Sequence, residues 1–423
     1  MTELKVVARS LVEGGCSVER LVCHPRLPLV ACWDSERPAV RLWDCGGQQL
    51  REIGVVGAEA EGYGEAVGWD RMELTPAAAW HPEQALLVVA TAEGLWRWTP
   101  DGASAVGDGA SYRCLAFSPD GRALWASPSW REGSEDWESS DVIDLGSGAV
   151  STGPGWDTGV AAHPGGGLVA TLVSDQGATY CLFARVGNGD GVAPTAMRRL
   201  RHALILDCDG YETPVFSPDG RHFAIRGNAY GNYVEVFEFP SLRRVLSAAL
   251  GDPNPGYPYP QEWLDQMASW SRHNLAFATR PGRLWIAAPG GALLEVDVET
   301  GDTTDHSGPP GSCLTTLTVT PPGELLGATD DGRLLLLSVL ADPTATTGDA
   351  PDNHELAGAA VAAFLAATSE LSADADLESG LVVTDGTRSW EADDLEAVTE
   401  ADSTDPTWLQ LRAAVNKAFA EDT

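Results

Sequence analysis

Basic residues are scarce in this sequence. Its 423 residues include 61 Asp and Glu but only 27 Lys and Arg, which gives a formal net charge of −34 at pH 7. Lysine occurs only at Lys5 and Lys417. A chain this acidic repels nucleic-acid phosphates and anionic lipid headgroups, and it attracts basic partners. We therefore expect no nucleic-acid partner and no membrane partner.

Long apolar runs are also missing. No stretch approaches the ~20 apolar residues that a membrane-spanning helix needs. The start of the chain, from Met1 to Lys5, shows neither the charged n-region nor the apolar h-region of a signal peptide. The expected location is the cytoplasm.

The eight cysteines form no C-x-x-C pair. Cys23, Cys32, Cys114 and Cys181 lie in predicted strands, where a free cysteine behaves as a small buried hydrophobe. We expect reduced thiols, as is usual in a cytoplasmic protein. The alternative is a disulfide between Cys23 and Cys32 on neighbouring strands.

Motifs that carry known chemistry are absent from the sequence. There is no G-x-S-x-G, no H-E-x-x-H, no phosphate-binding loop and no clustered His and Cys ligands. We therefore expect no catalytic residues, no cofactor and no bound metal.

What the sequence does contain is a repeated turn signature. Ser-Pro-Asp-Gly occurs at Ser118–Gly121 and Ser217–Gly220, each time between two apolar runs. Proline presets the first central position of a β-turn and glycine allows a positive φ, so the flanking strands reverse tightly. Five looser copies share the pattern: His24-Pro25, His81-Pro82, His163-Pro164-Gly165, Arg280-Pro281-Gly282 and Thr320-Pro321-Pro322-Gly323.

The spacing of these seven turns predicts the fold. A unit of ~40–50 residues with several short strands is the mark of a propeller blade. The first copy shows four runs rich in Val, Leu, Ile and Trp that read as strands: Val18–Cys23, Leu29–Trp33, Val40–Trp43 and Gln49–Val55. The prediction is an all-β fold, a seven-bladed β-propeller over residues 1–340.

One blade needs a strand from elsewhere in the chain. The seventh copy ends near Leu340 without a fourth strand, whereas Leu4–Ala8 is a strand-like run with no blade of its own. An open sheet edge would expose unpaired backbone groups. We therefore expect the N-terminal strand, residues 4–9, to close the propeller as the outer strand of the last blade.

Two kinds of run resemble a known family. Val40-Arg41-Leu42-Trp43-Asp44 resembles the third-strand signature of WD-repeat propellers, and the Phe-Ser-Pro-Asp-Gly-Arg runs at Phe117–Arg122 and Phe216–Arg221 resemble bacterial WD-like repeats. The resemblance covers roughly residues 4–340 and implies the propeller. It implies no particular function, because propellers host many functions.

Two features that suggest metal ligands have simpler interpretations. His24, His81 and His163 occupy one repeat position, so they lie on separate turns, and we expect turn capping rather than a metal triad. Asp207–Glu212 lacks the twelve-residue ligand spacing of a calcium loop and is expected to be an acidic turn.

Residues 341–423 form a small acidic extension with 18 Asp and Glu and three basic residues. Ala341–Pro351 reads as a linker, and His354–Leu371 and Thr407–Ala420 read as helices. Trp408, Leu411, Val415 and Phe419 share one face of the second helix. This mainly helical extension is expected to dock on its own propeller; the alternative is that it binds a partner.

The long predicted connections are of two kinds. Some join the fourth strand of one blade to the first strand of the next, and others join the second and third strands of a blade. Most of these long connections therefore fall on the same face of the propeller. Such one-sided insertions usually mark a binding face. They combine acidic residues with the Tyr and Trp residues common at interface anchors. The candidate partner-binding residues are Tyr63, Trp69, Trp130, Trp137, Trp156, Tyr211, Tyr230, Tyr257, Tyr259, Trp263 and Trp270.

The sequence thus favours a non-enzymatic interaction scaffold or adaptor that binds a basic segment of a protein partner. Two alternatives stay open. One is a propeller hydrolase or lyase with a site at the central axis. The other is a propeller that binds a sugar or another small ligand. The sequence does not predict the oligomeric state.

Overall fold

Seven sheets account for most of the described structure; six have four strands and one has six, and each contains a four-stranded antiparallel blade. The computed structural model describes residues 3–108, 112–129, 139–175, 177–187, 196–208, 210–228, 231–252, 255–256, 258–269, 272–306, 313–340, 353–372 and 377–421. Seven such blades define the seven-bladed β-propeller, which confirms the predicted fold class. The chain divides into two compact units: unit 1 is Met1–Gly155 with Pro255–Pro351, and unit 2 is Trp156–Asn254 with Asp352–Thr423.

Unit 1 contains five blades. Blade 1 is β2 (Val18–Cys23), β3 (Leu29–Asp34), β4 (Val40–Asp44) and β5 (Arg51–Val56). Blade 2 is β6 (Ala77–Trp80), β7 (Leu87–Thr91), β8 (Gly94–Thr99) and β9 (Gly102–Asp108). Blade 3 is β10 (Cys114–Phe117), β11 (Ala123–Ser127), β12 (Ser139–Asp144) and β13 (Val150–Pro154). Blade 6 is β22 (Leu275–Phe277), β23 (Arg283–Ala287), β24 (Leu293–Asp297) and β25 (Thr303–Asp305). Blade 7 is β26 (Leu314–Val319), β27 (Leu325–Thr329), β28 (Arg333–Leu340) and β1 (Glu3–Leu11).

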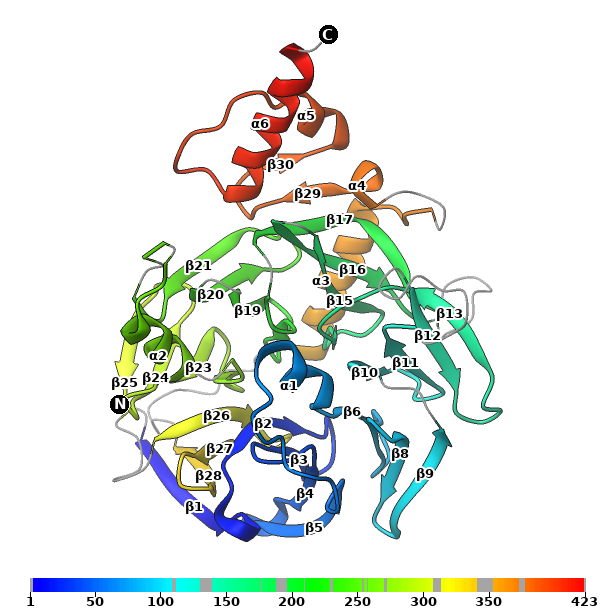
Figure 1. Ribbon diagram of the computed structural model, residues 1–423, viewed down its shortest axis with the longest axis vertical. Coiled ribbons are helices and arrows are strands. Elements are labelled where there is room, and N and C mark those ends of the chain that lie inside the picture. Colours follow the sequence, from blue (N-terminus) through cyan, green and yellow to red (C-terminus); the bar gives the residue numbers. More distant parts are fainter. Residues whose placement is uncertain are drawn as a thin grey trace. The chain divides into compact units, whose positions relative to one another are not determined.

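The N-terminal strand completes blade 7, as predicted. β1 pairs antiparallel with β28, from Leu4 opposite Val339 to Leu11 opposite Arg333, and the two strands lie side by side in Figure 1. Leu4 and Val6 pack against an apolar cluster of blades 6 and 7 that includes Trp285. The pairing therefore gives hydrogen-bond partners to the backbone groups at the edge of β28, and it also buries apolar side chains of β1.

Unit 2 contains two blades and the C-terminal extension. Blade 4 is β14 (Val160–Ala162), β15 (Leu168–Asp175), β16 (Ala178–Arg185) and β17 (Arg198–Asp207). Blade 5 is β18 (Val215–Phe216), β19 (His222–Asn228), β20 (Gly231–Glu238) and β21 (Arg244–Ala249). The extension is α3 (Asn353–Ala367), α4 (Leu377–Gly380), β29 (Val382–Thr384), β30 (Ser389–Trp390), α5 (Ala392–Ala397) and α6 (Thr407–Glu421).

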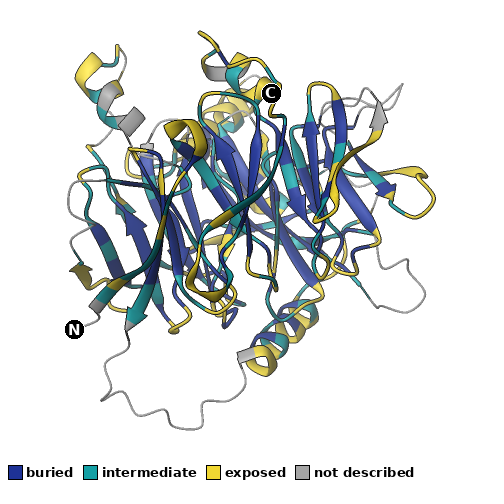
Figure 2. Cartoon of the chain, turned by 90° about the horizontal axis from the view of Figure 1, so that it is seen from below, coloured by how far each residue is buried: buried dark blue, intermediate teal, exposed yellow. Residues whose placement is uncertain are grey.

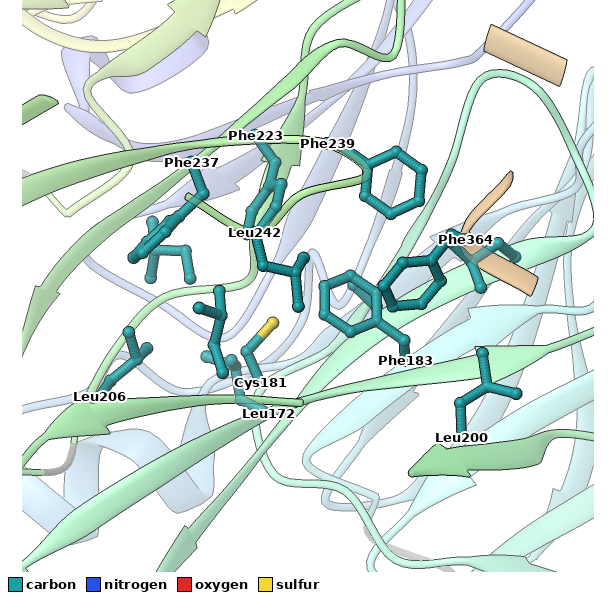
Figure 3. Packing of buried hydrophobic residues seen from close by; sticks show 14 of the residues in the cluster. Leu172, Cys181, Phe183, Leu200, Leu206, Phe223, Phe237, Phe239, Leu242 and Phe364 are labelled. Carbon is teal, nitrogen blue, oxygen red and sulfur yellow. The ribbon is translucent and has the colours of Figure 1, made fainter. Parts of the chain in front are cut away.

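The extension is docked on these two blades. β29 adds to the outer edge of blade 4 in parallel with β17. Helix α3 inserts Phe364 beside Phe183 and Phe239, with 5.0 Å between ring centroids in both cases, and Figure 3 shows the three rings together. The last helix buries Trp408 against Trp390, edge to face at 5.3 Å. Aromatic pairs of this kind stabilise a core beyond their buried area.

One predicted helix face needs correction. Trp408 is buried, but its predicted companions Leu411, Val415 and Phe419 are exposed. The residues of α6 that bury beside Trp408 are Leu409 and Ala413. Trp408 and Leu409 share an apolar cluster with blade 4 and with Val383 of β29, so the other apolar side of the helix faces out.

The seven turns between first and second strands show a repeated arrangement. His24 Nδ1 accepts the backbone N–H groups of Arg26 and Leu27, and its Nε2 lies 2.8 Å from the carbonyl oxygen of Gln84 in the next blade. His163 caps its own turn in the same way and reaches Gly220 O at 3.0 Å. Since Nδ1 accepts, Nε2 carries the proton and donates it across the blades. The expected turn capping is confirmed, with an added bond between blades.

The buried residues lie mostly in the strands. Figure 2 shows the strands mostly buried and the turns and helix surfaces exposed. All eight cysteines are free, including Cys23 and Cys32. None of the helices in the described ranges is both long and apolar enough to cross a membrane.

Candidate partner-binding surface

Two long connections of unit 1 contain helices. Helix α1 (Gly68–Leu74) lies between blades 1 and 2, and helix α2 (Gln261–Ser269) precedes blade 6. Both connections join a fourth strand to the next first strand, and both were predicted as loops of the binding face. Connections of this type leave the same ends of the blades, where insertions in repeat proteins commonly bind partners.

Several candidate rings lie beyond the part that the structure describes. Trp69 lies in the first turn of α1, and only its backbone is described. The candidates outside the described residues are Trp130, Trp137, Tyr230, Tyr257 and Trp270.

Two candidate rings of unit 2 are turned inward. Trp156 is fully buried. Tyr211 belongs to the apolar cluster of blades 4 and 5, and its hydroxyl donates to the carbonyl oxygen of Asp207 at 2.6 Å. These rings stabilise their own connections and offer no surface to a partner in this structure. Their loop sequences, which mix aromatic and acidic residues, gave no sign of this inward orientation.

Tyr63 anchors the α1 connection to blade 1. Its ring is buried, and the Arg71 guanidinium carbon lies 3.1 Å from the ring centroid. Arg71 also donates to the Ser35 carbonyl oxygen at 2.9 Å and to the carboxylate of Glu19. Burial raises the pKa of Glu19, while the Arg71 charge opposes this rise. Tyr63 N donates to Glu36 O at 2.9 Å. Several contacts of Tyr63 and Arg71 therefore attach the connection to blade 1.

Above this base, α1 presents apolar side chains to solvent. Val67 is 77% exposed, Met72 45% and Leu74 38%. Five carboxylates of the same connection are also exposed: Glu59, Glu61, Glu65, Asp70 and Glu73. Glu73 pairs with Arg113 at 3.2 Å. A connection that exposes both apolar and acidic side chains on an anchored base is complementary to an apolar, basic segment.

Helix α2 presents a second group of exposed residues. Tyr259 and Trp263 are half-buried and stack with 5.2 Å between their ring centroids. Leu264 beside them is 40% exposed. The Trp263 N–H donates to the carbonyl oxygen of Pro260, which starts the helix. The sequence Pro260-Gln-Glu-Trp is a helix-start signal that the prediction of a loop overlooked.

Enzyme-like groups are few. Within the described ranges, no group of three or more His, Cys, Asp and Glu side chains could hold a metal ion. The nearest to a catalytic pair is buried Glu295, which accepts from His306 Nε2 at 2.9 Å and from Arg280 at 3.1 Å. Neither His306 nor Glu295 hydrogen-bonds to a described hydroxyl or thiol. Among the described residues, the pair therefore has no adjacent nucleophile of the kind that acyl-transfer chemistry requires.

Comparison with known proteins adds no family. The chain matches no protein-family model, and no curated protein matches it. The described geometry establishes the propeller class, and function has to be argued from its surfaces.

Proposed function

We propose that this protein is a non-enzymatic interaction scaffold of the cytoplasm that binds a protein partner. The partner contacts the blade ends that carry α1 and α2. It offers a segment with apolar anchors flanked by Arg or Lys, since the α1 connection exposes both apolar and acidic side chains.

The observation that carries this proposal is the exposed apolar group of Val67, Met72 and Leu74 on an anchored base. Exposed apolar side chains gain free energy when a partner covers them, at roughly 25 cal/mol per Å² of apolar area removed from water. The Tyr63–Arg71 contact fixes the base beforehand, so little ordering is left to oppose binding. The exposed acidic residues attract a basic segment and speed its approach.

A repeated capping aspartate supports a WD-repeat-like origin for the blades. Asp44 ends the third strand of blade 1 and accepts the Gly46 N–H at 2.8 Å. Asp144 of blade 3 and Asp297 of blade 6 cap the following turn in the same way. The acidic half of the Trp-Asp signature therefore has one structural role in three blades, although the tryptophan is present in one.

The first test compares two variants with matched chemistry. Met72→Glu with Leu74→Glu places charge at the apolar centre of α1, whereas Val150→Glu places it at an exposed apolar position of blade 3 that lies outside the α1 connection. Proteins captured from a lysate of the native host by the full chain are identified, and the affinity of the captured partner is measured. We expect the α1 variant to lose about 2 kcal/mol or more of binding free energy, as hot spots do, and Val150→Glu to bind normally.

Reversing the charge of exposed acidic residues tests whether they speed the approach of the partner, separately from the apolar contacts that hold it. Glu65→Lys with Asp70→Lys should slow association and flatten its salt dependence, with a smaller effect on dissociation. Equal partner binding by the wild type and the Met72→Glu, Leu74→Glu variant would show that the partner uses another surface.

A further inference from the structure

A cleft of about 600 Å³ lies between blades 2 and 3. Val88, Arg97 and Ser104 are directly opposite one another on β7, β8 and β9, so their side chains share one face of blade 2. Arg122 and Leu145 of blade 3 line the other side. Blade contacts are normally filled to the density of a protein interior, so an opening of this size between two blades is unusual.

The cleft lies away from the α1 surface. Strand β6 runs from Ala77, next to the α1 connection, to Trp80, next to the turn that begins at His81. His81 lines the cleft. The cleft and α1 therefore lie at opposite ends of the same strand.

Two arginines in the cleft form no ion pair within 4.0 Å among the described residues. Arg97 and Arg122 are exposed, and neither forms an ion pair with any residue that the structure describes. In a chain with 61 acidic residues and 27 basic ones, most arginines find a carboxylate, as Arg71 and Arg283 do. Two guanidinium groups from different blades thus border the same cleft.

Asp144 and His81 of the cleft are already engaged in hydrogen bonds. Asp144 Oδ1 accepts the N–H groups of Gly146 and Ser147 and the Ser147 hydroxyl. The Ser147 hydrogen bonds, and to a smaller extent the Arg122 charge, lower the pKa of Asp144. His81 Nδ1 accepts the N–H groups of Glu83 and Gln84, and burial lowers the pKa of His81. At neutral pH the residues that line the cleft thus include two cations, one anion and a neutral imidazole, and the nearby carboxylates of Glu83 and Asp120 also act on His81.

We propose that this cleft binds a small organic carboxylate with an apolar body. Arg97 and Arg122 hold the carboxylate, because a guanidinium matches the planar geometry of that group. Leu86, Val88 and Leu145 contact the apolar body. The volume lies within the range of roughly 300–1,000 Å³ found for small-ligand sites. The site is independent of the partner surface around α1.

Calorimetric titration of the full chain with octanoate tests this site. Acetate supplies the carboxylate without the apolar body, and 1-octanol supplies the apolar body without the carboxylate. We expect saturable one-site binding of octanoate, with acetate and 1-octanol at least about tenfold weaker. Arg97→Gln and Arg122→Gln should each weaken octanoate binding about tenfold, the loss expected for one hydrogen bond to a charged group.

Arg9→Gln is the matched control, because Arg9 is an exposed arginine of β1 that also has no ion pair among the described residues. It should bind octanoate like the wild type, and so should the Met72→Glu, Leu74→Glu variant. The inference is overturned if octanoate gives no saturable binding up to about 10 mM, a limit well above typical small-ligand dissociation constants. Unchanged binding in both arginine variants, or equal binding of 1-octanol, overturns it as well.

Discussion

Single residues connect neighbouring blades at the turns between first and second strands. The rings of His24, His81 and His163 pack against the aromatic residue that ends the first strand of the next blade, at 4.9 to 5.3 Å between centroids. A Cβ added to Gly121 or Gly220 would come within 2.2 or 2.5 Å of the facing imidazole. A histidine in one blade therefore requires a glycine in the next at these two junctions.

The sequence predicted the capping role of these histidines but missed the second bond. Repeat alignment shows that His81 and His163 hold equivalent positions in their own blades. It does not show which atom of the next blade lies opposite the ring. Gly121 and Gly220 were interpreted through their positive φ alone, which is only one of the two reasons for glycine there.

Stability should fall as the pH is lowered, because of His163. Burial lowers the pKa of His163 from its ordinary 6.5 to about 4. The folded state therefore binds a proton at His163 less readily than the unfolded state does. The free energy of unfolding is not reduced by this difference above pH 6.5, and it falls as the pH is lowered from 6.5 toward 4. Linkage gives a loss of about 2 kcal/mol at pH 5. Urea unfolding at pH 7 and pH 5 should show this loss in the wild type and a smaller one in His163→Gln.

Thr320→Ala is the control for that measurement. The Thr320 hydroxyl donates to the Glu324 carbonyl oxygen and accepts the Glu324 N–H, both at 3.1 Å, and it does not titrate. Its loss should lower stability equally at both pH values. An identical pH dependence in the wild type and His163→Gln would rule out His163 as the source.

At the scale of elements, strands were predictable and the inserted helices were not. β2 has the predicted boundaries, since short apolar runs between turn residues identify buried strands. Helix α1 has seven residues and no side-chain cap. Its apolar side chains face solvent, so it lacks the inward period of an amphipathic helix. Helix α6 was predicted by its period, but the period did not show which apolar side would bury against blade 4 and β29.

The contribution of β1 can be measured with two neighbouring substitutions. Val6 is partly buried against the blade 6 and 7 cluster, whereas Lys5 next to it is exposed. Val6→Asp should lower the melting temperature by several degrees, because it places an unpaired charge in an apolar site. Lys5→Asp should have little effect. Deleting residues 1–10 should lower the melting temperature at least as much as Val6→Asp, and an unchanged melting curve would contradict the closing role of β1.

At the scale of the whole molecule, the repeat predicted the propeller but not the association of the extension with blades 4 and 5. Seven turn signatures were enough for the fold class. Helix α3 docks through the contacts of Phe364 with Phe183 and Phe239, and no local sequence pattern reveals such contacts. The candidate site was predictable only as a set of long connections, because buried Trp156 and half-exposed Trp263 look alike in sequence.

The net charge of −34 should make stability depend on salt. Repulsion among carboxylates opposes the folded state, and ions screen it within a Debye length of about 10 Å at 0.1 M. The melting temperature should rise by a few degrees between about 10 mM and about 0.2 M NaCl and then level off. A flat or falling profile, or a rise that continues in proportion to salt, would exclude screening as the main effect.

The pairing of the first strand with one of the last has a consequence for synthesis on the ribosome. Leu4 emerges early, yet its partner Val339 is added only after nearly all the blades. Blades 4 and 5 likewise wait for Phe364 before their shared core is complete. At about 5–20 residues per second, both intervals last many seconds. During that time the nascent chain carries an unmatched strand and an uncovered aromatic surface, which a ribosome-associated chaperone is suited to protect.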